Sequence, residues 1–346
     1  MAIPLSLNLM RLGLVLGGGG LIGLGFHAGA LKALEERGTD VRHADVIVGT
    51  SAGAIIAGYL AAGWRPADFF DYANGTHPAA QADPHEHIRE LRRLFTPTWS
   101  SRSERLRRGA GSVFVMASSR GLWPTGGRRP AAWLRRTFPA GMYSTAATLS
   151  RLSDDLPDSW PRSGVYLCAA EMYGGKRVVF GSPDAPEAPF PDAVLASTAI
   201  PGFFESVGIG GRHYVDGGVV SATSLDVATD AGCDAILCIA PLGYRKDAPI
   251  PFHNPFKLAP VAVRFPFART LRREVRRARE RGIDVAVIRP WVSDLEALGS
   301  NSMRPHDRSE IAELSRRGVH RTLDELGEHP AVASFANRVA GTDRSS

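Results

Sequence analysis

The sequence contains few cysteines and lacks long uninterrupted apolar segments. Its three cysteines, among 346 residues, show no CxxC spacing and no zinc-ligand spacing with histidine, so neither a disulfide framework nor a zinc site is expected. No apolar run is long enough to span a bilayer, and the N-terminus shows no secretory leader with a cleavage site. These absences favour a cytoplasmic protein with buried, reduced thiols and no metal.

Motifs for nucleotides and nucleic acids are also missing. The chain has no GxxxxGK[ST] loop, which excludes a P-loop enzyme, and no zinc finger, helix-turn-helix or RNA-binding aromatic pattern. We therefore expect no nucleic-acid partner, although the formal net charge is +6. Clustered arginines favour either solvated helix faces or contact with the anionic headgroups of a membrane; the clusters lie at 89–95, 102–108, 126–136 and 269–282.

Short strands and helices alternate in the first part of the chain. Apolar stretches at 12–16 and 44–49 predict buried strands, and each precedes a predicted helix, over 24–37 and 51–63. This order predicts parallel strands joined by right-handed crossovers, in an α/β fold. Further strands are expected at 164–172, 176–182, 212–218, 234–242 and 284–290, and further helices at 192–204, 270–281 and about 307–326.

The pattern indicates one domain over residues 8–330, followed by a C-terminal tail at 331–346. The segment 66–160 is basic, aromatic and less regular, which predicts a helical or irregular insertion or cap. Apolar residues between 110 and 145 suit an acyl groove, a membrane contact or an ordinary helical layer over the sheet; they are Val113, Phe114, Met116, Trp123, Trp133 and Met142.

Ser51 is the candidate nucleophile. It lies in GTSAG, between a predicted strand and a predicted apolar helix, where a nucleophile elbow requires small residues such as Gly49 and Gly53 on both sides of the serine. The amides at the start of that helix would face the group that Ser51 attacks. The alternative is a serine that only caps the helix.

Four consecutive glycines follow the first predicted strand. The stretch 18–23 matches GxGxxG, a dinucleotide-binding fingerprint, but the second strand ends at Gly49-Thr50-Ser51 and not in the acidic residue that a ribose needs. An oxyanion hole requires only exposed, converging backbone amides, and the amide of Ala52 is a further candidate donor. Only this second interpretation uses both motifs.

Asp216 is the candidate base, because the histidines are poorly placed. Only His213 lies near the end of a late predicted strand. Asp216 ends that strand and precedes Gly217 and Gly218, so its carboxylate would stand on a turn that opens to a cleft. The alternative is an aspartate in an ordinary Asp-Gly hairpin turn.

These stretches, taken in order, resemble the patatin-like phospholipase family. The matching residues are GGGGLIG (17–23), GTSAG (49–53) and DGG (216–218), with similarity also in 27–36 and 196–218. The resemblance implies a patatin-like, three-layer α/β/α fold with a mostly parallel central sheet. It also implies a Ser51–Asp216 dyad without histidine, and an oxyanion hole formed by the amides of Gly18, Gly19 and Gly20. Many members carry Arg or Lys where this chain has Ile22, a difference that bears on lipid preference.

The expected function is hydrolysis of lipid acyl esters through an acyl-enzyme intermediate, without metal or cofactor. The substrate is a lipid or another acyl ester, with peripheral contact to an anionic membrane as a further expectation. Three alternatives stay open at this point. They are a catalytically silent lipid-binding or regulatory protein of the same fold, a nucleotide-binding Rossmann-like protein, and a Ser-His-Asp hydrolase that uses His213.

Overall fold

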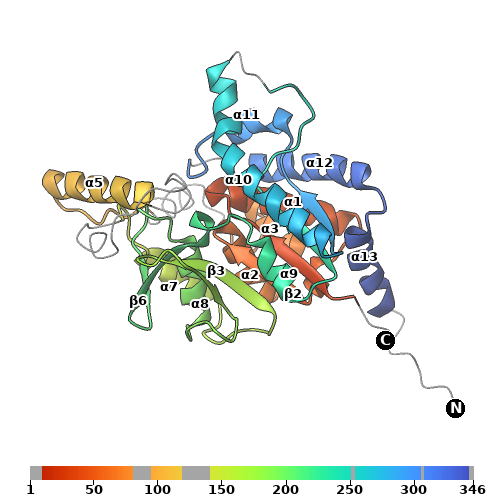
Figure 1. Ribbon diagram of the computed structural model, residues 1–346, viewed down its shortest axis with the longest axis horizontal. Helices are drawn as coiled ribbons and strands as arrows, with labels where there is room; N and C mark the ends of the chain where they lie inside the picture. The colour runs from red at the N-terminus through yellow and green to blue at the C-terminus, as the bar shows by residue number, and fades with distance from the viewer. Residues whose placement is uncertain (1–9, 81–94, 119–140, 251–253, 305–307, 343–346) are drawn as a thin grey trace.

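The computed structural model describes residues 10–80, 95–118, 141–250, 254–304 and 308–342 (Figure 1). In these ranges eight strands form one sheet in the order β5-β6-β3-β2-β1-β7-β8, with β4 paired to β3. The strands are β1 (Leu12–Leu16), β2 (Val46–Thr50), β3 (Val165–Glu171), β4 (Arg177–Phe180), β5 (Val207–Ile209), β6 (Arg212–Asp216), β7 (Ala235–Ile239) and β8 (Asp284–Ile288).

The central part of the sheet is parallel. β2, β1, β7 and β8 run in one direction, and β3 pairs in parallel with β2. β4, β5 and β6 add antiparallel pairings at the β3 side. The carboxyl ends of β1 and β2, which carry the glycine loop and Ser51, therefore lie side by side at one edge, where α/β folds place their binding sites. The expected mostly parallel sheet is confirmed.

Helices cover both faces of the sheet. Alternate residues of β1 point to opposite faces, so Leu14 and Leu16 join one buried cluster and Val15 joins the other. The first cluster includes side chains of α1 (Gly20–Glu36), α2 (Ala52–Ala61), α8 (Phe190–Thr198) and α12 (Arg308–Leu326). The second includes side chains of α9 (Leu225–Asp230) and α10 (Pro255–Glu280). This is the three-layer α/β/α arrangement that the sequence predicts.

The expected cap contains three helices in its described parts, α3 (Pro66–Ala73), α5 (Arg102–Ser118) and α7 (Ala146–Asp155). α5 extends away from the sheet in Figure 1. Trp123 and Trp133, and the basic segments 89–94 and 126–136, lie outside the described residues, as do the side chains of Val113, Phe114 and Met116. The roles that the sequence suggests for these residues stay predictions.

The C-terminal segment differs from the expected tail. Pro330–Thr342 form helix α13, which packs on β7 and β8 and buries Ala331 and Phe335 completely. The burial of an aromatic ring stabilises the fold, so this part of the segment belongs to the helical layer. Within the described ranges, no helix is both long and apolar enough to cross a membrane.

Candidate active site

Ser51 occupies a sharp turn between β2 and α2. Its backbone has φ 55° and ψ −124°, a strained combination for a residue other than glycine. The flanking glycines are required by close approach. A Cβ atom on Gly49 would lie 2.7 Å from the Cα of Ala54, and one on Gly53 would lie 2.0 Å from the carbonyl oxygen of Leu16. The turn therefore has the geometry of a nucleophile elbow.

Asp216 lies at the end of β6, facing this turn. Its side chain accepts a hydrogen bond from the amide of Gly218 at 2.7 Å, and the hydroxyl of Ser51 lies close enough to the carboxylate to affect its pKa. Gly217 must lack a side chain, because a Cβ atom there would lie 2.2 Å from the carbonyl oxygen of Cys168. Ser51 is 7% exposed and Asp216 is 5% exposed. The structure thus brings the two predicted residues together.

Burial raises the pKa of Asp216 to about 6, although the nearby hydroxyl of Ser51 and the hydrogen bond from Gly218 act in the opposite direction. The carboxylate is therefore a stronger base than an exposed aspartate. It still ionises at neutral pH.

The glycine loop lies against Ser51. A Cβ atom on Gly18 would lie 3.1 Å from the Cβ of Ser51, so only a glycine fits comfortably here. The amide of Gly18, however, donates to the carbonyl of Ala222 at 2.7 Å. This contradicts the expected role of Gly18 as an oxyanion donor, because its N–H group is already engaged in a backbone hydrogen bond.

Three other amides at this edge have no acceptor. In the described part of the chain, the N–H groups of Gly19, Gly20 and Ala52 donate no hydrogen bond. Gly20 begins α1 and Ala52 begins α2, so both amides belong to helix N-termini, where unpaired N–H groups carry partial positive charge. They are available to a negatively charged atom near Ser51.

His213 lies elsewhere. It lies in the exposed first part of β6, where its Nδ1 atom and the hydroxyl of Ser206 are 3.1 Å apart. Three residues along a strand correspond to roughly 10 Å, which separates His213 from Asp216. This position argues against a Ser-His-Asp arrangement built on His213.

Two buried side chains that support the site were not foreseen from the sequence. The hydroxyl of Ser197 accepts from the amide of Ser51 at 3.1 Å and donates to the carbonyl of Cys168 at 2.6 Å, which fixes the elbow to β3. Nε2 of His27 lies 2.7 Å from the carbonyl oxygen of Gly17. Burial lowers the pKa of His27 to about 4, so the ring is neutral and its Nε2–H group donates to the glycine loop.

A third unforeseen residue, Glu274 of α10, holds the loop that follows Asp216. Its carboxylate accepts from the hydroxyls of Ser221 at 2.6 Å and Thr223 at 2.5 Å. No local motif marks Glu274 or Ser197, because their partners lie far away in the sequence.

An apolar cavity opens beside Ser51. Its volume is about 100 Å³, and its lining includes Leu24, Ile55, Leu195 and Phe204. A nucleotide site requires roughly 300–1,000 Å³, so this space does not favour a dinucleotide. Among the described residues, no cluster of His, Cys, Asp and Glu suits a metal ion.

A second apolar space, of about 160 Å³, lies next to this cavity. The two share Leu21, Leu24, Ile55 and Thr148, so they adjoin. The second space lies between α1, α2, α3 and α7, and its far part is lined by aromatic residues, among them Trp64, Phe69 and Tyr72. Two adjoining apolar spaces beside Ser51 suit an extended apolar group that reaches into the helical layer.

A known protein family matches a large part of this chain. The family model for patatin-like phospholipase matches residues 14–229. Among solved structures, VipD from Legionella pneumophila is 16% identical with a TM-score of 0.42, and the match covers 91% of this chain and 67% of that one. ExoU in its complex with SpcU, from Pseudomonas aeruginosa, is 19% identical with a TM-score of 0.35, and the match covers 92% of this chain and 51% of that one.

This chain thus spans about half the length of the ExoU chain. A search of curated proteins found no match. The match to the family model covers more than half of the chain, including the glycine loop, Ser51 and Asp216. The chain belongs to the patatin-like phospholipase family, a family of lipid ester hydrolases.

Proposed function

We propose that the protein hydrolyses carboxylic ester bonds of lipids through a Ser51–Asp216 dyad and an acyl-enzyme intermediate. One observation carries the proposal. The hydroxyl of Ser51, on a strained elbow that lines an apolar cavity, lies beside the buried carboxylate of Asp216. A nucleophile in contact with a base, beside space for an apolar substrate, is the arrangement that acyl transfer requires.

In the first step, Asp216 accepts the proton of the Ser51 hydroxyl while Oγ attacks the ester carbonyl. The negative charge moves to the carbonyl oxygen, and the amides of Gly19, Gly20 and Ala52 are the donors best placed to stabilise it. The tetrahedral intermediate collapses, the C–O bond to the alcohol breaks, and Asp216 returns the proton to the leaving alcohol. Water then attacks the acyl-enzyme, with Asp216 again as the base, and releases the fatty acid and free Ser51.

The environment of Asp216 supports its role as base. An aspartate with an ordinary pKa is a weak base for a serine hydroxyl, and a carboxylate that titrates near neutral pH is better matched. Burial raises the pKa of Asp216 to about 6, which is in the required direction.

The two adjoining apolar cavities support a long acyl chain as part of the substrate. With the ester carbon at Ser51, the first methylene groups would lie beside Ile55 and Leu24, and the distal ones would reach Trp64 and Tyr72. Burial of each CH₂ group contributes about 0.8 kcal/mol, so a chain that fills this path binds better than a short one.

The test of the dyad is covalent labelling with an alkyl fluorophosphonate. We expect the native protein to be labelled at Ser51 and to hydrolyse p-nitrophenyl esters, and Ser51→Ala to do neither. Asp216→Asn should be labelled far more slowly. Absence of labelling in the folded native protein would instead favour the alternative of a silent lipid-binding protein.

The acyl path is tested by chain length. Ala73 lines the distal cavity, whereas Ala67, on the same helix, does not. Ala73→Phe should lower kcat/KM for a hexadecanoyl ester several-fold and leave a butanoyl ester unchanged, while Ala67→Phe should change neither. An equal loss for both esters would place the acyl chain elsewhere.

Contact with an anionic membrane is the further expectation for this function. Leu106 of α5 is 75% exposed and lies among exposed arginines of the same helix. An apolar side chain within a basic surface suits headgroup contact. Leu106→Asp should reduce sedimentation with vesicles that contain phosphatidylserine. The cytoplasmic location stays a prediction.

A further inference from the structure

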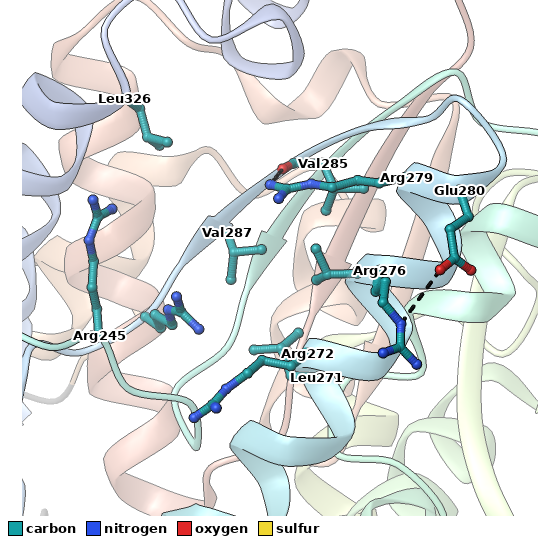
Figure 2. A pocket seen from close by; sticks show the side chains of 11 residues that line it. Arg245, Leu271, Arg272, Arg276, Arg279, Glu280, Val285, Val287 and Leu326 are labelled. Atoms are coloured by element: carbon teal, nitrogen blue, oxygen red, sulfur yellow. Dashed lines mark hydrogen bonds and ion pairs between the residues drawn. The ribbon is translucent and has the colours of Figure 1, made fainter.

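A third cavity lies away from Ser51, beside β8, the last strand of the described sheet. This groove has a volume of about 680 Å³ and is lined by α10, by β8 and by the end of α12 (Figure 2). It shares no lining residue with the two cavities of the proposed acyl path. We refer to it as the β8 groove; its lining residues are Arg245, Leu271, Arg272, Val275, Arg276, Arg279, Glu280, Val285, Val287, Arg289 and Leu326.

The β8 groove combines a cationic rim with an aliphatic floor. Five of its lining residues are arginines and one is a glutamate. The floor consists of valine and leucine side chains, of which Val287 and Val275 are only half-buried. In Figure 2, Arg245 lies to the left of Val287 and Arg272 lies below it, whereas Arg276 and Glu280 lie to the right.

The arginines differ in how their charge is balanced. Arg276 pairs with Glu280 at 3.6 Å, and Arg245 pairs with Glu325. Among the described residues, Arg272 and Arg289 form no ion pair. The Nε atom of Arg289 is buried and has no hydrogen-bond partner there. One end of the groove therefore holds guanidinium groups that lack an anion.

The clustering of these guanidinium groups disfavours the charged form of Arg289. Burial, followed by the nearby charges of Arg245 and Arg272, lowers the pKa of Arg289. Like charges held together around a partly buried guanidinium destabilise the fold unless an anion binds among them. Guanidinium groups bind carboxylate and phosphate oxygens in a bidentate manner, so an oxyanion is the fitting counter-charge.

We infer that the β8 groove binds a single-chain anionic amphiphile, with its carboxylate or phosphate head among Arg245, Arg272 and Arg289 and its alkyl chain on the floor. The chain would lie along Leu271, Val275 and Val287. A volume of this size accommodates a ligand of that class. The inference goes beyond the proposed hydrolysis, since it concerns binding at a site that Ser51 does not reach.

Other partners fit less well. The lining contains no aromatic side chain on which nucleic-acid bases would stack. A peptide that added a strand to β8 would need the carbonyl of Val285, but Arg279 already donates to that oxygen at 2.9 Å.

The test is calorimetric titration of the folded Ser51→Ala protein, which removes turnover, with dodecyl phosphate below its critical micelle concentration. We expect saturable binding that Arg272→Gln/Arg289→Gln weakens at least tenfold. The matched control is Arg273→Gln/Arg277→Gln, which removes two exposed arginines of α10 that do not line the groove. Because both double variants remove two charges, equal weakening would indicate general charge attraction and overturn the inference.

Three further ligands separate head from chain. Dodecanoate should bind at the same site and show the same dependence on Arg272 and Arg289, and its relative affinity shows which head is preferred. Inorganic phosphate and dodecyl maltoside should each bind at least tenfold more weakly than dodecyl phosphate. If either bound as tightly, the amphiphile would be the wrong class. Sedimentation with phosphatidylserine vesicles tests a membrane surface as the ligand. If the double variant Arg272→Gln/Arg289→Gln no longer bound the vesicles while the control variant still did, the proposed class of ligand would also be wrong.

A variant that keeps every arginine guards against a folding defect. Val275→Glu places a carboxylate on the floor of the groove, and we expect it to weaken dodecyl phosphate as well, with a thermal unfolding midpoint close to that of the parent protein. Unchanged affinity in this variant would contradict the placement of the chain. Fluorophosphonate labelling of otherwise native protein that carries the groove substitutions should be normal, so a failure of this inference is separate from a failure of the proposed hydrolysis.

Discussion

The amide of Gly18 donates to the carbonyl of Ala222 at 2.7 Å, which joins the glycine loop to the loop that follows Asp216. Ala222 lies between Ser221 and Thr223, and the hydroxyls of both donate to Glu274. The loops that carry the two halves of the candidate site are thus fixed to each other and to α10. Gly18, which the resemblance implied as an oxyanion donor, instead has a structural role in the site.

We therefore predict that Glu274 positions the site. Glu274→Ala leaves two buried hydroxyls without their acceptor, so the loop after Asp216 should loosen and kcat for a p-nitrophenyl ester should fall about tenfold or more, with KM nearly constant. Glu274→Gln retains one acceptor oxygen and should recover part of the rate. Steady-state kinetics of both variants, beside the exposed Glu280→Gln, would measure this. Equal rates in all three would remove Glu274 from the positioning network.

The sequence alone predicts the candidate residues that lie within short motifs, and the backbone geometry of those motifs explains why. Ser51 and Asp216 lie in turns where the backbone demands glycine neighbours, so the local pattern records their geometry. Ser197 and Glu274 act through partners that are 146 and about 50 residues away, and no pattern of short range records such contacts.

Helix boundaries show a similar limit. The sequence predicts a helix at 270–281, but α10 begins at Pro255 and continues through Pro260 and Pro266. Proline removes a backbone donor and disfavours a helix interior, so local propensity gives the wrong start. In the structure, the buried guanidinium of Arg264 donates to the carbonyls of Pro260 and Gly299, a tertiary contact that supports this part of the helix.

The raised pKa of Asp216 predicts opposite effects of one substitution on stability and activity. At pH 7 the folded protein holds an ionised, buried carboxylate, whereas the unfolded chain holds an exposed one. Because the folded pKa, about 6, lies above the unfolded value of 3.8, protonation favours the folded state. Asp216→Asn should therefore stabilise the fold at pH 7, by about 1–3 kcal/mol, and abolish hydrolysis.

The pH dependence of the stability gain tests whether desolvation of the Asp216 carboxylate is its cause. Below about pH 3 the wild-type carboxyl is neutral in both the folded and the unfolded state, so the stability advantage of Asp216→Asn should vanish in urea unfolding at that pH. The wild-type kcat/KM should rise with pH, reach half of its maximum near pH 6 and level off about one pH unit higher, because the base must be ionised. A stability gain that did not depend on pH would show that desolvation of Asp216 is not its source.

Ile22 occupies the position where many members of the family carry a basic residue. The structure buries Ile22 in a cluster with Tyr244, Val261 and Leu298, and its amide lies 3.3 Å from the carbonyl oxygen of Ser302. We predict that Ile22→Lys destabilises the fold by roughly 3 kcal/mol or more at pH 7, because an ammonium group would be buried without a partner. Ile22→Val, which removes one methyl group, should cost about 0.5–1.5 kcal/mol. Equal unfolding midpoints for Ile22→Lys and wild type would mean that a basic residue is accommodated here.

We predict that Ser197→Ala lowers activity, although Ser197 does not contact the substrate carbonyl. In Ser197→Ala, the amide of Ser51 loses its acceptor and the carbonyl of Cys168 loses its donor, both in a buried place. A buried polar group without a partner costs about 1–3 kcal/mol, so the elbow should relax from its strained backbone and displace Oγ from Asp216.

The control for this effect is a serine that is equally buried but distant from the elbow. Ser315 donates to the carbonyl of Phe26 at 2.7 Å and is 3% exposed. We expect Ser197→Ala and Ser315→Ala to lower the unfolding midpoint by comparable amounts, while only Ser197→Ala lowers kcat and the rate of fluorophosphonate labelling by tenfold or more. If both variants reduced the labelling rate equally, the effect would follow from lost stability. If neither did, the strained turn at Ser51 would hold without Ser197.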